Sequence, residues 1–571
     1  MARSALETGT DRGSLEASPA YRVVWEPAAP VDLFDPAPVA TPAAVRAVMD
    51  GSLAVVRRHA DAGTLYDRDG VVAAAVISGL AEAGYWGLRA GRAHGGSGAS
   101  FADLASFITE MAAVDGWVAG LASAHACIGP VNLLELFGTA DQKDRLLPAL
   151  ARGERLGAFA VTEPGAASDW GAMRTTAERH GDTLLITGEK LFITNAAPGR
   201  TLGVVCRLDG VLRMAIVELP DEESSSFRTV RYTMRAPSHC VNRGLVFDRL
   251  AVPAANVLPG DGRRIAFRAL NHGRVAVCAN AAGLLRSLAG SLLPWVRTRQ
   301  TFGAAIGSRE LVQRRLGRLA ARIVGCDAMA AWGAALLDRG YRGELECVTA
   351  KVVGSEALKD ATVDVLLRTH GARALLAGNL FADAVHDLLA PVVYEGENEI
   401  LTLGFFGSLV RRRVGGVPAE VAGEGRDEAR SDRPVPGAGA VPLALADQAA
   451  WAEHALRQLG HEIDGALRAH GPAMAARQAA AFDLARRVQD ALAMLVVARY
   501  GTRQPDERVR DAAACLAAEI GYRLTGARPA VRHDAMLTEL GAAVVEDRFA
   551  PTTGTARPDV AMPLHIDRYT S

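Results

Sequence analysis

The spacing of apolar side chains changes along the chain and divides it into helical and sheet regions. In residues 41–155 apolar side chains recur every three or four positions, which predicts an all-α domain. Short strand-like runs replace this spacing in residues 156–258 and predict a compact β domain. Helical spacing returns in residues 259–413, which can hold several bundled helices. This order predicts an α+β fold. The clearest strand-like runs are residues 183–187, 191–194, 201–208 and 214–219.

Three further segments complete the predicted organisation. Residues 1–40 mix Ser, Pro, Ala and Asp without apolar periodicity, and we expect a loose arm or a few packed turns there. Residues 414–442 are rich in Gly, Pro, Glu and Arg, which predicts a flexible linker. Apolar residues then fall on helical faces again, so residues 443–571 are predicted to form a C-terminal helical domain. The apolar stretch 491–500 is expected to be part of its core.

Charge and hydropathy argue against large anionic partners. The 571 residues include 63 Lys and Arg and 64 Asp and Glu, and this balance favours a small ligand over nucleic acid or an anionic membrane surface. No uninterrupted run of about 18 apolar residues occurs, so no membrane-spanning helix is predicted.

The cysteines indicate a reducing environment. All seven are scattered without CxxC or Cys/His metal spacing, and their number is odd. We therefore expect reduced cysteines, no metal site and a cytoplasmic location. The N-terminal residues lack an apolar signal core and include Glu7, Asp11 and Glu16, so neither a signal peptide nor a transit peptide is expected.

Two polar segments in the predicted β domain carry candidate binding chemistry. Val161-Thr-Glu-Pro-Gly-Ala-Ala-Ser-Asp169 is a strand that ends in a Pro/Gly turn, which exposes backbone N–H groups beside short hydroxyls and suits a polar ring edge. Taken alone, such a segment is more often an ordinary capped turn. Gly188-Glu-Lys-Leu-Phe-Ile-Thr-Asn195 follows as a hairpin strand with an aromatic and a hydroxyl side chain, which could meet a flat heterocycle.

These segments resemble the TEPGxGSD-like loop and the K-W/F-I-T-N strand of the acyl-CoA dehydrogenase family. Two later segments also resemble this family. Arg299-Gln-Thr-Phe-Gly303, followed by Gln313, is similar to its R-x-x-F-G segment, and Val393-Tyr-Glu-Gly-Glu-Asn-Glu-Ile400 to its Y-E-G-T-N-E-I segment. The resemblance spans residues from about 80 to 410 and implies an FAD-dependent enzyme.

The family's reaction places a carboxylate base near the acyl α-carbon, and the resemblance assigns this role to Glu395. Flavin N5 would accept the hydride from the β-carbon, because no side chain can accept one. The backbone N–H of Glu395 and a flavin ribityl hydroxyl would polarise the thioester oxygen. A minority of the family places its base immediately before an Arg that corresponds to Arg274, where this chain has Gly273. The sequence therefore selects Glu395, although an isolated Glu would more often be a solvated carboxylate.

The resemblance also implies binding residues. Phe192 and Thr194 would contact the isoalloxazine ring, and Arg299, Thr301 and Gln313 would reach the pyrophosphate or adenine of an FAD in a partner subunit. The alternatives are that Phe192 is merely core and that Arg274 is a solvated helix-surface residue. The residues assigned to FAD are Phe159, Val161, Thr162, Ser168, Phe192, Thr194, Arg299, Thr301, Phe302, Gln313, Arg368, Gly371 and Glu397. Those assigned to the substrate are Ser168, Asn271, Arg274 and Gly396.

The chain departs from the family pattern near the predicted base. Arg368-Thr-His-Gly371 replaces a Gln followed by a Gly-rich loop, so Arg368 would make an ionic contact to FAD phosphate in place of the Gln amide. Glu397 stands where Thr or Ser is more familiar, and Glu399 adds another acid. We expect these like charges to raise the pKa of Glu395.

Three functions are compatible with these residues. The first is α,β-dehydrogenation of an acyl-CoA, or of an acyl group on a carrier protein, with an electron-transfer flavoprotein as acceptor. The second is an oxidase or monooxygenase in which reduced flavin reacts with oxygen. The third is a non-catalytic flavoprotein scaffold, which the presence of Glu395 disfavours. The C-terminal module resembles that of the very-long-chain branch, which implies a homodimer. Membrane association through an amphipathic helix is a less favoured alternative.

Overall fold

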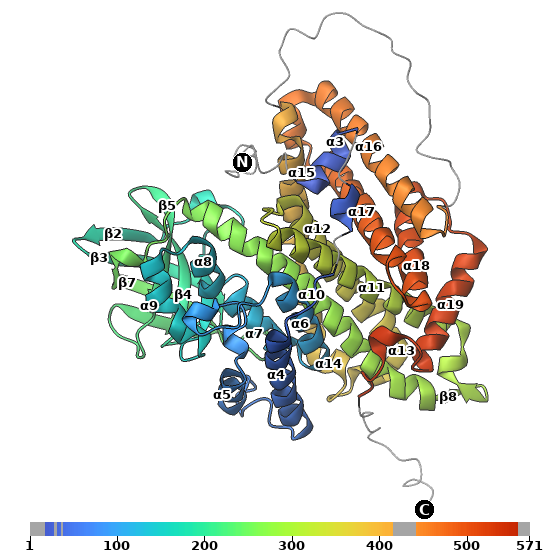
Figure 1. Ribbon diagram of the computed structural model, residues 1–571, viewed down its shortest axis with the longest axis horizontal. Coiled ribbons are helices and arrows are strands. Elements are labelled where there is room, and N and C mark those ends of the chain that lie inside the picture. The colour runs from blue at the N-terminus through green and yellow to red at the C-terminus, as the bar shows by residue number, and fades with distance from the viewer. Residues whose placement is uncertain (1–17, 28–30, 36–37, 415–440, 558–571) are drawn as a thin grey trace, which may run out of the picture.

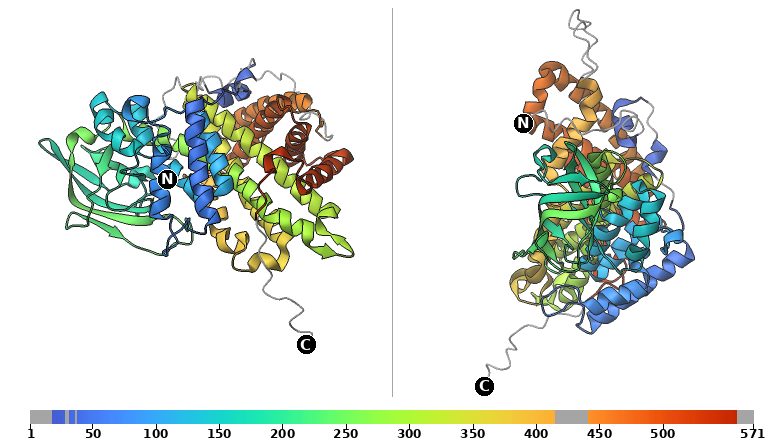
Figure 2. Two further views of the ribbon diagram at one scale, coloured as in Figure 1. Left: turned by 60° about the horizontal axis from the view of Figure 1, so that its bottom comes forward. Right: turned by 90° about the vertical axis from the view of Figure 1, so that its left-hand side faces the viewer.

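A sheet from the middle of the chain forms one end of the molecule and helices form the rest, which confirms the predicted α+β class (Figure 1). The computed structural model describes residues 18–27, 31–35, 38–414 and 441–557. Most of the predicted linker lies outside the described residues. Figure 2 shows the sheet at one end of an elongated molecule and the C-terminal helices towards the other.

Three helices of the first helical domain begin at polar side-chain caps. Ser100 and Asp103 form a capping box at the start of α6, and Asp115 caps α7 by accepting from the N–H groups of Trp117 and Val118. These caps satisfy donors that would otherwise be left unpaired where the helices pack. The helices are α4 (Ala43–Asp61), α5 (Ala74–Glu82), α6 (Phe101–Val114), α7 (Gly116–Ala126), α8 (Pro130–Phe137) and α9 (Ala140–Ala151).

Seven strands form one sheet in the middle of the chain. The order is β1-β4-β2-β3-β7-β6, and β5 pairs with β4 outside this path. β1 and β4 run parallel, whereas β3 pairs antiparallel with both β2 and β7. The strands are β1 (Gly157–Ala160), β2 (Thr176–His180), β3 (Thr183–Thr194), β4 (Thr201–Leu208), β5 (Val211–Glu218), β6 (Phe227–Val230) and β7 (Asn242–Pro253).

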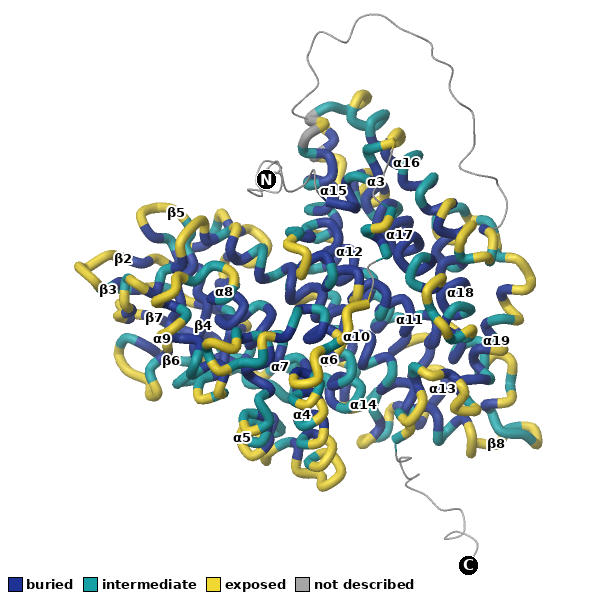
Figure 3. Tube along the Cα trace, viewed as in Figure 1, coloured by how far each residue is buried: buried dark blue, intermediate teal, exposed yellow. Residues whose placement is uncertain are grey.

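One long helix, α10, connects the sheet to the rest of the molecule. It has 37 residues and packs against α6, α7, α11 and α12. Figure 3 shows buried residues concentrated along α10, α11 and α12. The helices of this second domain are α10 (Gly262–Thr298), α11 (Glu310–Asp338), α12 (Glu344–Asp360), α13 (Arg368–His370), α14 (Leu380–Leu389) and α15 (Asn398–Val414). A two-stranded hairpin, β8 (Gln300–Thr301) and β9 (Ala304–Ala305), follows α10.

The C-terminal helices pack closely on α11 through two glycines. A Cβ at Gly541 would lie 2.7 Å from the Cα of Gln313, and one at Gly317 would lie 2.8 Å from the backbone carbon of Leu537. Only a residue without a side chain allows the two backbones to approach this closely. The helices are α16 (Leu445–His470), α17 (Gln478–Thr502), α18 (Glu507–Thr525) and α19 (Val531–Val545).

The described part of the N-terminal segment is packed rather than loose. Helix α3 (Pro19–Trp25) begins at Ser18, whose hydroxyl donates to the buried carboxylate of Glu346 at 2.5 Å. The Trp25 indole donates to the Leu409 carbonyl, 3.2 Å away. This segment therefore contacts α12 and α15, more than 300 residues later in the chain.

The absence of an uninterrupted apolar run predicted no membrane-spanning helix, but length and mean hydropathy do not support this prediction. Three helical stretches among the described residues reach these values, and they contain α7, α10 and α11. In each, 78% of the most apolar window is buried inside the protein. These helices are apolar because they form the core. The stretch 491–500 is also mostly buried.

Replacing Gly541 by Ala tests the packing of α19 on α11. We expect a lower thermal unfolding midpoint, because the added methyl overlaps with the backbone of Gln313 and overpacking commonly costs about 1–3 kcal/mol. Gly465→Ala is the matched control. Gly465 also lies in a helix, α16, but a Cβ there would have no neighbouring atom within 4 Å. An unchanged midpoint for Gly541→Ala, or an equal fall in the control, would contradict this packing.

Candidate active site

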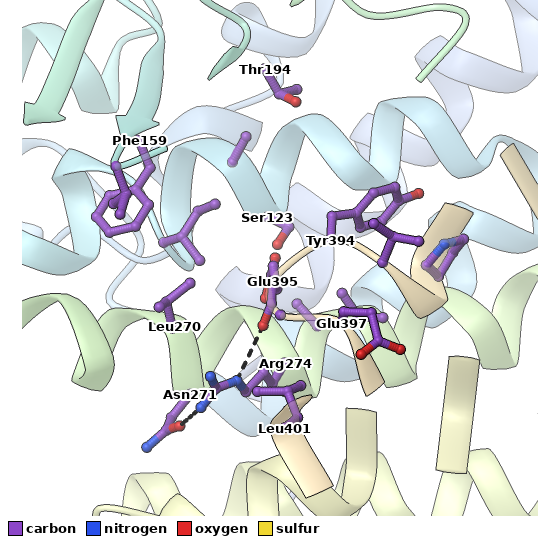
Figure 4. Close-up of a pocket in the computed structure, with 18 of the residues that line it drawn as sticks. Ser123, Phe159, Thr194, Leu270, Asn271, Arg274, Tyr394, Glu395, Glu397 and Leu401 are labelled. Carbon is purple, nitrogen blue, oxygen red and sulfur yellow. Dashed lines mark hydrogen bonds between the residues drawn. The ribbon is translucent and has the colours of Figure 1, made fainter. Parts of the chain in front are cut away.

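A cavity of about 1520 Å³ lies between the sheet and the helices (Figure 4). Its walls come from α7, the turn after β1, the end of β3, the first half of α10 and the segment 393–397. Elements far apart in the sequence therefore enclose one space.

The two polar segments of the β domain are bound to each other at this cavity. The Leu191 N–H donates to the Thr162 carbonyl at 2.9 Å. Beneath this contact, the fully buried Lys190 donates to the Glu163 carboxylate at 2.8 Å and to the Val161 carbonyl at 3.0 Å. A buried ion pair needs such additional hydrogen bonds to offset its desolvation. This pair fixes the turn that follows β1 against β3.

Phe192 projects from an irregular point of β3 rather than into the core. Its φ is +59°, and its side chain is 54% exposed at the cavity wall. The Phe192 N–H donates to the Tyr232 hydroxyl, which in turn donates to Asn242. The Asn242 amide donates to the Thr194 hydroxyl at 3.1 Å. The alternative that Phe192 is merely core is therefore wrong.

Glu395 carries an orphaned carboxylate oxygen at the cavity. Its Oε2 is buried and has no hydrogen-bond partner among the described residues. The residue has a φ of +58°, which is uncommon for a non-glycine residue and is found where the surroundings hold the chain. Arg274 is also buried, and it donates weakly to the Glu395 carbonyl at 3.4 Å and to the Asn271 side chain at 2.8 Å (Figure 4). Arg274 is thus not a solvated surface residue.

Gly273 provides the space that this carboxylate occupies. A Cβ at Gly273 would lie 2.7 Å from the Glu395 Cδ and would overlap with the carboxylate oxygen and with Ile128. The two positions that the sequence offered for a base are therefore neighbours in space. A side chain at position 273 would therefore exclude the Glu395 carboxylate from its present place.

Burial raises the pKa of Glu395 from 4.5 to about 7, while the positive charges of Arg274 and Lys351 oppose this rise. The expectation that neighbouring acids cause the rise was wrong. Glu397 instead turns its carboxylate to the N–H groups of Glu399 and Ile400, at 3.0 to 3.1 Å, and caps α15. A capping role explains an acid at this position.

Lys351, which no motif indicated, is fully buried beneath the segment that carries Glu395. Its ammonium donates to the carbonyls of Val392 and Gly396 and to the Asn398 side chain. A single buried lysine on α12 gives no sequence signal, because its acceptors lie some 40 residues away.

The predicted site residues fall into two groups. The first lines the cavity, and the second lies beyond the C-terminal half of α10. Ten residues of the first group are Phe159, Val161, Thr162, Ser168, Phe192, Thr194, Asn271, Arg274, Gly396 and Glu397. The second group is Arg299, Thr301, Phe302, Gln313, Arg368 and Gly371. Since Arg274 and Arg299 are 25 positions apart, α10 separates them by roughly 37 Å. The second group cannot touch a ring held by the first group of the same chain.

Within the second group, Arg299 lies over Trp295, with its guanidinium carbon 5.6 Å from the ring centre. The Gln313 amide donates to the Gly307 carbonyl at 3.0 Å, and Arg368 pairs with Asp364 at 3.2 Å. Phe302 is 99% exposed. Contact of this group with an FAD in a partner subunit stays a prediction.

The first group fits a flat, polar-edged ring such as that of FAD. The exposed face of Phe192 and the hydroxyls of Thr162, Ser168 and Thr194 border the same cavity. An aromatic face packs on a conjugated ring, and short hydroxyls suit the ring's polar edge. Glu395 borders the cavity as well, so a bound ring and this carboxylate would share one space.

Comparisons with known proteins agree with this geometry. Three family models of acyl-CoA dehydrogenase match: the N-terminal domain at residues 41–154, the middle domain at 158–248 and the C-terminal domain at 260–404. An acyl-CoA dehydrogenase of Bacillus subtilis (strain 168) is 28% identical over 343 residues, which cover 57% of this chain and 87% of that protein. The very long-chain specific enzyme of Rattus norvegicus mitochondria is 28% identical over 342 residues, covering 57% of this chain and 52% of the rat protein.

Among solved structures, an acyl-CoA dehydrogenase complexed with FAD from Bacillus anthracis has a similar fold. The TM-score is 0.73 at 21% identity, and the match covers 92% of this chain and 98% of that chain. The similarity therefore includes C-terminal helices that lie beyond the three family models.

Replacing Glu395 by Gln tests the environment of its carboxylate. Below about pH 4.5 the carboxyl is protonated in the folded and the unfolded chain and contributes nothing to the pH dependence. As the pH rises to 7, the unfolded chain ionises first, so wild type loses about 3 kcal/mol of stability that the variant keeps. Chemical unfolding between pH 4.5 and 8 should show that the free energy of unfolding of the variant increases relative to that of wild type as the pH rises.

The control for this substitution is Glu222→Gln at an exposed position. A stability difference between Glu395→Gln and wild type that stays constant or shrinks with increasing pH would contradict the buried, unpaired carboxylate.

Proposed function

Because this chain belongs to the acyl-CoA dehydrogenase family, we propose that it removes hydrogen from the α and β carbons of an acyl thioester, with Glu395 as the base. The observation that carries this proposal is the orphaned Glu395 Oε2 at a cavity large enough for cofactor and substrate. A carboxylate without a protein partner is free to accept a proton from a ligand.

The surroundings of Glu395 suit proton abstraction. Burial strengthens the carboxylate as a base, and a pKa of about 7 lies close to neutral pH, where a general base works best. Arg274 and Lys351 keep part of the population ionised. Gly273 leaves the carboxylate room to approach the substrate α-carbon.

The thioester oxygen needs donors as negative charge develops on it. We assign one donor to the backbone N–H of Glu395, which the left-handed conformation of this residue orients. Asn271 and Arg274 position the base. Arg274 contacts the Glu395 carbonyl and donates to the side-chain oxygen of Asn271, whose side-chain NH₂ donates to the Arg342 carbonyl at 2.8 Å. FAD, the cofactor of this family, would supply the hydride acceptor when bound in the cavity.

We further propose an acyl-CoA as substrate, an electron-transfer flavoprotein as acceptor and a homodimer as the assembly. Support for the substrate and the acceptor comes from the family. Support for the dimer comes from α18 and α19, which cover part of α11 within the same chain and leave less of this helix for other subunits.

An anaerobic titration tests the reaction. Purified protein with bound FAD should lose its flavin absorbance when acyl-CoAs of graded chain length are added, and Glu395→Gln should lower the rate at least about 100-fold. Exposing the reduced protein to air and measuring hydrogen peroxide distinguishes an oxidase from a dehydrogenase. If no acyl-CoA bleaches the flavin, carrier-protein thioesters become the next substrates to test.

Moving the carboxylate to the neighbouring position tests the geometry of the base. In the double variant Gly273→Glu, Glu395→Gly, the new side chain enters the space that the old carboxylate leaves, because a Cβ at position 273 points there; the Ile128 side chain, which this Cβ also overlaps, must shift as well. We expect the double variant to reduce its flavin at least about tenfold faster than Glu395→Gly alone. Equal rates for the two proteins, with equal FAD content, would contradict the shared space.

A further inference from the structure

We infer that Lys351 is a positioning residue for Glu395: its ammonium holds the turn that presents the base and, by its charge, favours the ionised form. This inference rests on the proposed function, because it assigns Lys351 to the site at which Glu395 would act.

The geometry shows Lys351 clamping both sides of the Glu395 turn. Its Nζ donates to the Val392 carbonyl at 3.2 Å, to the Gly396 carbonyl at 2.6 Å and to the Asn398 side-chain oxygen at 2.6 Å. Val392 precedes the base, whereas Gly396 and Asn398 follow it. An ammonium has three N–H donors, and here each has an acceptor in one short segment.

The turn needs such a clamp because its backbone is unfavourable. Glu395 has a φ of +58° and Gly396 a φ of +104°, so two successive residues adopt positive φ values. A non-glycine residue keeps this conformation only where surrounding contacts hold it. A Cβ at Gly396 would also lie 2.6 Å from Leu401, so the turn is pressed against α15 as well.

A second layer of hydrogen bonds joins the clamp to α12 and α15. Asn398, the first residue of α15, donates to the Glu356 carboxylate at 2.6 Å and to the Ser355 hydroxyl at 3.1 Å. Both partners belong to α12, as Lys351 does. The network therefore fixes the start of α15 relative to α12, with the Glu395 turn between them.

Lys351 acts on Glu395 in a second way, because its positive charge affects the protonation of the Glu395 carboxylate. Arg274 on α10 and Lys351 on α12 both lower the pKa of Glu395, whereas burial raises it. Burial also lowers the pKa of Lys351, and the negative charge of Glu395 opposes that change. The other titratable groups that interact with this pair are Glu356, Glu397, Cys127 and Tyr394. Removing the Lys351 charge therefore raises the pKa of Glu395.

Two variants of Lys351 separate its charge from its geometry. Lys351→Gln keeps hydrogen-bond donors but removes the charge, whereas Lys351→Arg keeps the charge in a planar group that cannot meet three converging acceptors equally well. The Glu395 pKa is measured on the FAD-bound protein by pH-difference infrared spectroscopy. The band of its protonated carboxyl is identified by its loss in Glu395→Gln.

We expect Lys351→Gln to raise the Glu395 pKa by about 1 unit and to move the acidic limb of the flavin-reduction rate to higher pH by the same amount. Lys351→Arg should leave the pKa near its wild-type value and slow reduction about tenfold. A purely structural lysine would change the unfolding midpoint without moving the infrared titration. Wild-type pKa and rate in both variants would overturn the inference.

The matched controls are Lys143→Gln and Lys143→Arg. Lys143 also donates to a backbone carbonyl, that of Glu135 at 2.9 Å, but on α9 away from the cavity lining. If both Lys351 variants fail to fold, Asn398→Ala removes one acceptor and keeps the lysine. It should slow reduction at an unchanged Glu395 pKa, and a wild-type rate would overturn the inference.

The infrared titration also keeps the two proposals distinct. If no thioester reduces the wild-type flavin, the proposed function fails, while the shift of the Glu395 band in Lys351→Gln still tests the clamp. If wild type is reduced and the Lys351 variants match it in rate and pKa, only the clamp fails.

Discussion

The missing side chain at Gly273 determines where a carboxylate can lie in this protein. Glu395 belongs to a segment more than 100 residues later, and its carboxylate fills the space beside Gly273 in the first half of α10. Protein interiors are close-packed, so a methyl group at this position could be accommodated only by moving both the carboxylate and Ile128. The cavity, the environment of the base and its approach to a ligand all depend on this one position.

The site is assembled from parts that are stabilised separately. The turn after β1 is held to β3 by a buried ion pair between Glu163 and Lys190. The turn of Glu395 is held to α12 by Lys351. Two buried lysines thus fix irregular backbone whose own conformational preferences would not hold it. Charged groups are costly to bury, and each ammonium has close acceptors: Lys351 has three, and Lys190 has two, of which one is a carboxylate.

Local sequence patterns predicted the order of helices and sheet because each pattern reflects a periodicity of the backbone. They also indicated several cavity-lining residues, since the Thr162 turn and the Phe192 strand are contiguous segments. They could not reveal that Lys351 contacts Gly396, that Gly273 contacts the carboxylate of Glu395, or that Glu397 caps a helix. Such contacts join residues across the fold or depend on a side-chain direction, and neither leaves a local pattern. The same reason explains why β2, β6 and β7 and the distant contacts of α3 were not predicted.

The position of α3 has a consequence for how the chain folds as it is made. Ala20 donates to the Glu346 carboxylate across 326 positions of sequence, so this helix leaves the ribosome long before its partner exists. At bacterial and eukaryotic synthesis rates the delay is roughly 15 to 65 seconds. During that time the apolar face of Tyr21, Val23 and Val24, buried in the finished protein, has no place to dock. A segment synthesised more than 300 residues before its partner is thus among the last to reach its native contacts, and its exposed face is a natural target for chaperones.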